Sequence, residues 1–190
     1  MFEGVGRRHA ETGTLISIGA HSLNGNERDF LFRNNGDGTF TDVAWVNAAD
    51  RVEDGRALSI FDYDRDGELD VILRNFRQPA QLLHNRGGAN HWLQLKLVGT
   101  RSNRDAVGAR IRLETARGWQ TRYVTAGSGY LSAQSLVQHF GLGDQTRATR
   151  IEIFWPSGAR TELRDVPGDR RHAIVEGVED SLPLQVAHQR

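Results

Sequence analysis

The chain of 190 residues has no cysteine, and Lys96 is its only lysine. The lack of cysteine excludes a disulfide framework, thiolate metal sites and a cysteine nucleophile. No run of 18 apolar residues occurs, and the N-terminal stretch lacks the apolar core of an export signal. We therefore expect no membrane insertion and no export signal within this sequence.

The sequence also has no excess of charge of either sign, because 24 acidic residues balance 24 basic ones. A neutral chain has no global field that would draw it to a polyanion or to an anionic membrane surface. We expect no nucleic-acid partner. The hydrophobic content of 38% is sufficient for a core in one large or two small domains.

Long helical stripes are missing too, and the apolar residues instead alternate with polar ones. Leu93, Leu95 and Leu97 follow this period of two, as do Ile151 and Ile153. Together with 21 glycines at turn positions, the alternation predicts an all-β fold. We expect strands near residues 28–33, 39–45, 56–61, 69–74, 79–84, 91–98, 108–115, 119–126, 134–141, 149–155, 160–164 and 171–177.

The most informative segment that is present is an acidic loop at residues 62–70. Four carboxylates stand at its positions 1, 3, 5 and 9, around Gly67, which permits a sharp bend. Ca²⁺ prefers about 6–8 oxygen ligands, and alternate residues of a tight loop can supply them. A helical EF-hand would need an acid at position 12, where Leu73 stands. We predict Ca²⁺ as the cofactor, bound by Asp62, Asp64, Asp66, Asp70 and the backbone carbonyl of Glu68; the alternative is a solvated acidic turn without an ion.

A weak internal repeat precedes and follows this loop. Residues 31–36 return as residues 82–87, an offset of 51. A period near 50 is typical of a four-stranded propeller blade, but only one blade's worth of sequence is present. We expect that sheet to pack on the C-terminal half. Its uncovered edge can pair with a second copy, so we expect a dimer or higher oligomer as readily as a monomer. The expected organisation is an unassigned N-terminal segment (1–27), a blade-like unit with the acidic loop (28–86), a second β domain (91–177) and a loosely ordered tail (178–190).

Other candidate sites are weaker. Residues 34–39 are rich in oxygen and could hold a second ion, although two glycines there indicate a hairpin turn. Residues 103–105 could contact a ligand or form an Asx turn before the next strand. Ser128 stands between glycines, but no histidine or acid is tied to it by spacing. His91, His139 and His172 lack the spacing of a zinc site. We predict no catalytic residue.

Several motifs resemble a known combination of domains. Residues 34–43 and 61–70 resemble the FG-GAP or VCBS-type repeat of integrin alpha-chain propellers. Residues 103–110, 127–132, 139–143 and 155–158 are similar, in the same order, to the ASPIC/UnbV domain. That domain follows such repeats in the cartilage acidic protein family and in many bacterial relatives. The resemblance implies an extracellular or periplasmic calcium-binding protein with interaction roles, and it assigns the ion to the same five ligands.

The combined expectation is a calcium-binding, non-enzymatic interaction or scaffold module in which one blade-like antiparallel sheet packs on an UnbV-like β-sandwich or barrel. Its partner would be a protein or a glycan. One alternative is an enzyme or enzyme subunit whose substrate cleft calcium orders, which convergent polar residues in a deep pocket would favour. Another is a glycan-binding module, which an exposed aromatic cluster would favour, drawn from Trp92, Trp119, Tyr123, Tyr130 and Trp155.

Overall fold

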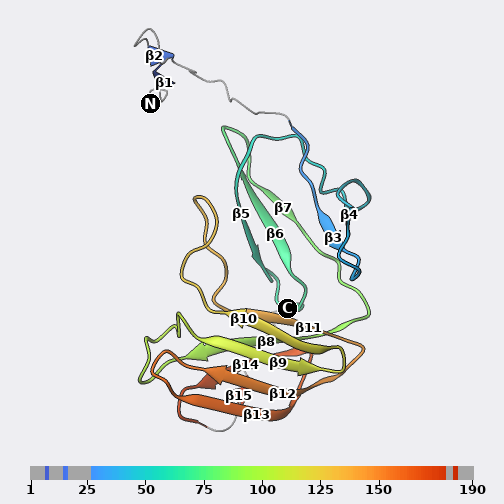
Figure 1. Cartoon of the computed structure of the whole chain (residues 1–190). Helices are drawn as coiled ribbons and strands as arrows, with labels where there is room; N and C mark the ends of the chain where they lie inside the picture. The colour runs from blue at the N-terminus through green and yellow to red at the C-terminus, as the bar shows by residue number, and fades with distance from the viewer. Residues whose placement is uncertain (1–6, 9–14, 17–26, 179–181, 184–190) are drawn as a thin grey trace. The chain divides into compact units, whose positions relative to one another are not determined.

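The computed structural model describes residues 7–8, 15–16, 27–178 and 182–183, and its described elements are strands apart from one short 3-10 helix (Figure 1). The predicted all-β class is confirmed. The chain divides into two compact units: the first takes the residues up to Ala57 with Leu73–Leu83, and the second takes Leu58–Ile72 with the residues from His84 onward. Most of the segments 1–27 and 178–190 lies outside the described residues. The domain boundaries and the loose tail stay predictions.

The first unit contains short strands. Strand β1 (Arg7–Arg8) pairs antiparallel with β2 (Leu15–Ile16), and β3 (Phe32–Asn34) pairs antiparallel with β4 (Phe40–Asp42), ahead of the helix η1 (Trp45–Asn47). The turn between β3 and β4 places Gly36 at φ 83° and Gly38 at φ 88°. The Asp37 carboxylate accepts hydrogen bonds from the backbone N–H and the hydroxyl of Thr39. Residues 34–39 therefore form the hairpin turn.

A three-stranded sheet follows, with its strands in sequence order. Strand β5 covers Gly55–Phe61, β6 covers Asp70–Asn75 and β7 covers Gln81–Leu83. The acidic loop joins β5 to β6, which is the placement that the short apolar runs on either side of it predict. This connection belongs to the second unit, together with the C-terminal half of the chain.

The rest of the second unit is a β-sandwich of two four-stranded sheets, ordered β10-β9-β12-β13 and β11-β8-β14-β15 (Figure 1). Among the described strands of the sandwich, every pairing is antiparallel except that of β8 with β14, which is parallel. The sheets remain separate, so the described residues form a sandwich and no closed barrel. The strands are β8 (His91–Val98), β9 (Arg110–Thr115), β10 (Gly118–Tyr123), β11 (Gln138–Gly143), β12 (Arg147–Phe154), β13 (Arg160–Pro167), β14 (Arg170–Val175) and β15 (Leu182–Pro183).

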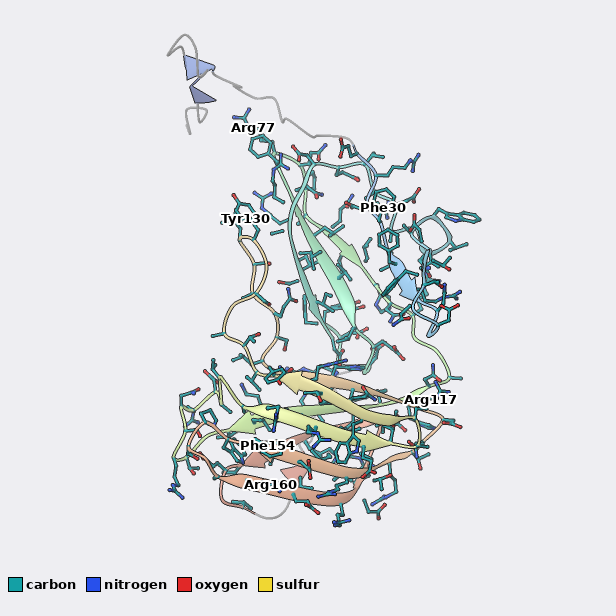
Figure 2. The ribbon with its side chains drawn as sticks, viewed as in Figure 1. Phe30, Arg77, Arg117, Tyr130, Phe154 and Arg160 are labelled. Carbon is teal, nitrogen blue, oxygen red and sulfur yellow. The ribbon has the colours of Figure 1, made fainter. Side chains whose placement is uncertain are left out.

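Alternating residues of these strands form the core. Their side chains are almost completely buried, and they come from both sheets: Leu93, Leu95, Leu97, Ile111, Leu113, Phe140, Ile151, Ile153 and Ile174. Alternation leaves the intervening residues on the outer faces. On the outer face of the first sheet, Arg112, Arg150 and Arg160 contact the carboxylate of Glu152 and cover it. Figure 2 labels Arg160 and Phe154 on that face.

A buried carboxylate ties two loops of the sandwich to the end of β14. Oε2 of Glu176 accepts hydrogen bonds from the backbone N–H groups of Thr100, Arg101 and Ser102, at 2.7–2.9 Å. Oε1 accepts from the hydroxyls of Ser102 and Ser157. Burial acts to raise the pKa of Glu176, but these bonds outweigh it and lower the pKa to about 2. Residues 103–107 form a turn next to this anchor, in which Oδ1 of Asn103 accepts from the Val107 N–H and the Asn103 carbonyl accepts from the Ala106 N–H.

We expect Glu176→Gln to destabilise the sandwich at neutral pH and to remove part of its acid sensitivity. Because the folded pKa lies below the ordinary value, the ionised anchor stabilises fully above about pH 4.5, and this contribution is lost as the pH falls toward 2. Thermal melts of the wild type between pH 7 and pH 2 should show that loss, and the variant should show a flatter profile. Glu114→Gln, on the outer face of β9, is the matched control and should keep the wild-type slope. Parallel profiles for Glu176→Gln and wild type would contradict the anchor.

Candidate metal centre

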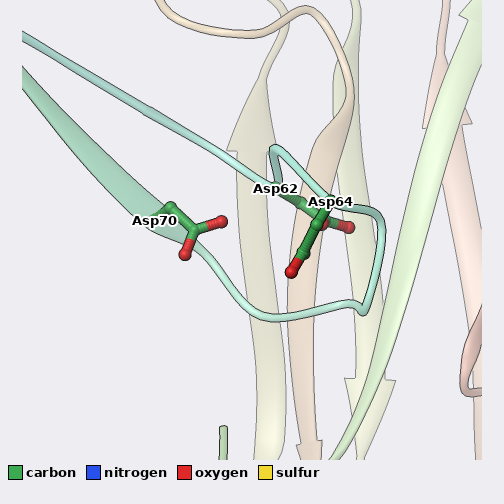
Figure 3. Close-up of side chains that lie close together, drawn as sticks. All are labelled: Asp62, Asp64 and Asp70. Carbon is green, nitrogen blue, oxygen red and sulfur yellow. The ribbon is translucent and has the colours of Figure 1, made fainter. Parts of the chain in front are cut away.

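The acidic loop brings three of its carboxylates together. Oxygens of Asp62, Asp64 and Asp70 all lie within 4.8 Å of one another (Figure 3). Asp62 follows the last residue of β5, and Asp70 is the first residue of β6. The side chain of Asp62 is 3% exposed and Asp70 is fully buried, whereas Asp64 is exposed. The group therefore has two fixed buried members and one member that solvent can reach.

Asp70 is fixed by the chain around it. Its Oδ1 accepts hydrogen bonds from the backbone N–H of Asn85 at 2.9 Å and from Nδ1 of His84 at 3.1 Å. Its Oδ2 accepts from the backbone N–H of Tyr63 at 3.1 Å. These bonds satisfy a buried carboxylate that would otherwise be unfavourable. They also hold its oxygens in place before any ion arrives.

Asp62 is satisfied at one oxygen only. Oδ2 accepts from Nε2 of Gln94 at 2.7 Å and from the Gly67 N–H at 3.2 Å. Oδ1 is buried and has no hydrogen-bond partner within the described residues. A buried oxygen without a partner carries a desolvation penalty of about 1–3 kcal/mol, and more when it is charged. A cation bound by the three aspartates would supply the missing partner.

The other two predicted ligands are arranged differently. Asp66 lies outside the group of three, and its Oδ1 accepts from the Glu68 N–H at 2.8 Å. The Glu68 carboxylate accepts from the Asn85 side-chain amide at 3.4 Å. Both residues shape the turn in the described structure. Their role as ligands, Asp66 through its carboxylate and Glu68 through its carbonyl, stays a prediction.

The loop is held against the outer face of the sandwich by one row of side chains. Arg171, Gln94 and His139 stand side by side on the paired strands β14, β8 and β11. The guanidinium of Arg171 donates to Oε1 of Gln94 at 2.6 and 2.8 Å, and Gln94 donates in turn to Asp62. His139 contacts the Gly67 carbonyl at 2.8 Å through Nε2, which must be the protonated nitrogen because a carbonyl only accepts. Burial lowers the pKa of His139 and favours this neutral form.

Gly67 allows an aromatic ring to lie against the loop. Its φ is +98°, and an added Cβ would lie 1.8 Å from Cε2 of Trp92. The Trp92 ring stacks in turn on His139, with centroids 6.2 Å apart. The glycine is therefore required for the contact with β8 as well as for the bend that its position in the sequence indicates.

The residues that hold the loop could not be identified from the sequence. Gln94 is a polar residue at an outward position of an alternating strand, where exposure is the ordinary expectation. It is instead 1% exposed, because the acidic loop covers it.

The aromatic residues considered for glycan binding differ in their exposure. Trp155 is 3% exposed and donates a hydrogen bond to Thr161, whereas Tyr123 and Tyr130 are 59% and 73% exposed. The five do not form one exposed cluster.

A cavity of about 520 Å³ lies beside the loop, over the same outer face. Ser128 is one of its lining residues. Within the described part of the chain, the hydroxyl of Ser128 has no histidine partner, and Nε2 of the nearby His139 is engaged by Gly67. The nucleophile and base that a hydrolase requires are not paired here.

Comparison with known proteins agrees with these features. The family described as ASPIC and UnbV matches residues 99–181, and the FG-GAP-like repeat matches residues 15–73, which include the acidic loop. The chain thus combines an FG-GAP-like repeat with an ASPIC/UnbV domain in an all-β fold. It is homologous to cartilage acidic protein 1.

The homology covers a large part of this chain and a small part of the relatives. Cartilage acidic protein 1 of Mus musculus and of Homo sapiens are each 35% identical to it over 139 residues, which are 69% of this chain and 21% of theirs. The Xenopus tropicalis protein of the same name is 37% identical over 121 residues, or 60% and 18%. The chain therefore spans about a fifth of the length of the curated relatives that it matches. The described residues contain no helical segment with the length and hydrophobicity of a transmembrane helix.

Proposed function

We propose that this chain is a calcium-stabilised interaction or scaffold module. The observation that carries the proposal is the buried Oδ1 of Asp62, which has no partner among the described residues and belongs to the group with Asp64 and Asp70. An anionic oxygen in that position is best satisfied by a cation. The donor set consists of hard carboxylate oxygens, with neither thiolate nor imidazole in the group, which suits Ca²⁺ better than zinc.

The ligands would be the carboxylates of Asp62, Asp64, Asp66 and Asp70 and the Glu68 carbonyl. Ca²⁺ accepts irregular oxygen sets at about 2.3–2.6 Å, whereas Mg²⁺ requires a near-ideal octahedron at about 2.0–2.1 Å. A loop whose oxygens lie up to 4.8 Å apart fits the larger and more tolerant ion. The ion would relieve the repulsion between the aspartates and so favour the folded loop.

Such an ion would act structurally. The loop contacts Gln94 and His139 on the outer face of the sandwich, and it is continuous with β5 and β6. Fixing it would therefore stabilise both its own turn and its contact with the sandwich. Sites of this kind in extracellular modules bind calcium at about 10⁻⁴–10⁻³ M, a range that suits a location where calcium is plentiful. An extracellular or periplasmic location is part of the proposal.

The interaction role is supported by exposed aromatic residues on the first unit. Phe30, Phe32, Phe40 and Trp45 are each at least 60% exposed, and the rings of Phe30 and Phe32 stack at 5.8 Å (Figure 2 labels Phe30). Large apolar groups gathered on a surface mark contact sites for proteins. We propose this group as the surface for a protein partner. Light scattering of the purified chain measures whether that partner is a second copy.

Titration calorimetry tests the metal proposal. The folded wild type should release or absorb heat with Ca²⁺ at millimolar or lower concentration and bind Mg²⁺ more weakly. Asp64→Ala removes the exposed ligand and should weaken calcium binding by about tenfold or more, since a charged ligand is lost. Asp105→Ala, at an exposed aspartate that pairs with Lys96, is the control and should bind like wild type. A folded protein that gives no heat with millimolar Ca²⁺ would refute the proposal.

A further inference from the structure

We propose that the cavity beside the acidic loop binds a carboxylate-bearing sugar. The cavity has a volume of about 520 Å³, within the range of about 300–1,000 Å³ that small-molecule sites occupy. It is bounded by the loop, by the C-terminal end of β10, by the N-terminal end of β11, and by the segment between those two strands, whose Tyr130 is labelled in Figure 2. All of its lining residues belong to the second unit.

The charge of the lining favours an anion. The lining contains three arginines, Arg65, Arg122 and Arg171, and one residue with a carboxylate, Asp62. The side chain of Arg65 is exposed and makes no hydrogen bond or ion pair with any other described residue. Arg122 donates only to the carbonyl of its neighbour Thr121, at 3.2 Å. Two guanidinium groups thus keep donors for a carboxylate, which they can bind in bidentate fashion.

The neutral part of the lining favours a sugar as the bearer of that carboxylate. Five lining side chains carry hydroxyls (Tyr63, Tyr123, Thr125, Ser128 and Ser135) and three carry amides (Gln94, Gln134 and Gln138). Within the described residues, the hydroxyls of Tyr123, Thr125 and Ser128 have no partner, so they remain available to sugar hydroxyls. The ring of Tyr123 is 59% exposed and offers a flat apolar face to a pyranose.

The cavity is connected to the metal centre through Asp62, which belongs to both. A cation at the centre would neutralise the one carboxylate of the cavity and leave its three arginines in excess. On this point alone the inference rests on the proposed calcium site. The sugar and the ion should then strengthen each other's binding by the same factor, because coupling between two sites is reciprocal.

The experiment uses the full chain and follows binding by calorimetry and by chemical-shift changes in two-dimensional NMR. The probes are glucuronate, glucose as its neutral counterpart, and N-acetylglutamate as an acidic-peptide group, each with calcium and with chelator. For a ligand of this size we expect glucuronate to bind with a dissociation constant on the order of 1 mM. Glucose and N-acetylglutamate should each bind at least about tenfold more weakly.

Matched variants locate the binding. Arg122→Gln and Arg65→Gln should each weaken glucuronate binding by about tenfold, since each removes a charge-assisted contact. Both side chains are exposed, so their substitution leaves the fold intact, which a thermal melt verifies. Arg104→Gln, at an exposed arginine outside the cavity, is the control and should bind like wild type. Arg171 is unsuitable, because it also holds Gln94.

The outcomes separate the two proposals. Glucuronate that binds no better than glucose, or that binds equally to Arg122→Gln and Arg104→Gln, overturns the cavity site. N-acetylglutamate that binds more tightly than glucuronate also overturns it, in favour of an acidic peptide. If calcium binds while glucuronate does not, the sugar site is overturned and the calcium site stands. If glucuronate binds and calcium gives no heat, the metal centre fails and the sugar site stands.

Discussion

Saturating calcium is expected to raise the thermal midpoint of this protein by about 5–10 °C over the value in chelator. Binding to the folded state alone stabilises by about 2.7 kcal/mol when free calcium is 100 times its dissociation constant. For a chain of this size, each kcal/mol shifts the midpoint by about 2–4 °C. Scanning calorimetry or circular dichroism melts in the two conditions measure the difference.

Two variants show whether that stability comes from the ion. Each variant removes a ligand from the proposed set: Asp64→Ala should lower the midpoint in calcium and change it little in chelator, and Asp66→Ala should lower it more in calcium than in chelator, where only the bond from the Glu68 N–H is lost. The Asp64 carboxylate accepts one long backbone bond, at 3.3 Å from the Asp66 N–H, so little besides ligation depends on it. Equal destabilisation in both conditions would mean that the aspartates serve only the geometry of the turn.

Gly67→Ala should destabilise the second unit by about 2–5 kcal/mol. The added Cβ would lie 1.8 Å from the Trp92 ring, and overpacking of this kind costs about 1–3 kcal/mol. The backbone at φ +98° adds a further penalty of about 1–2 kcal/mol for any residue with a Cβ. Because the loop would have to move off β8, calcium affinity should fall as well. Urea unfolding with and without calcium measures both effects.

A second glycine isolates the contribution of the contact. Gly158 has φ +87°, and an added Cβ there meets no atom within 4 Å. Gly158→Ala therefore carries the backbone penalty alone and should be the milder variant, with unchanged calcium affinity. If the two alanine variants were equally destabilised, the packing of Trp92 on Gly67 would contribute nothing to the docking of the loop.

Most of the fold was predictable because its signal is local. Each of the twelve predicted strands corresponds to one strand from β3 to β14, and the alternating residues, such as Leu93, Leu95 and Leu97, lie in the core. The pairing of strands was not predictable in this way. The parallel pairing of β8 with β14 joins residues more than 70 positions apart, and a period-two pattern does not indicate which distant strands pair.

In the candidate site, too, the local features were predictable from the sequence and the long-range contacts were not. The spacing of the acidic residues within 62–70 indicated the group of Asp62, Asp64 and Asp70, because alternate residues of a tight loop can turn their carboxylates inward. The docking row of Arg171, Gln94 and His139 comes from three separate strands, and its members are ordinary polar residues in the sequence. The Asp66 carboxylate accepts a hydrogen bond from the Glu68 N–H and lies outside the group of three, so its role as a ligand stays a prediction.

The most direct test of the account is a crystal structure of this chain grown with calcium. We expect one ion in the acidic loop, at about 2.3–2.6 Å from an oxygen of each of Asp62, Asp64 and Asp70, with the buried Oδ1 of Asp62 among the ligands. Diffraction near a wavelength at which calcium scatters anomalously identifies the ion. An ordered loop with no ion at millimolar calcium would contradict the account.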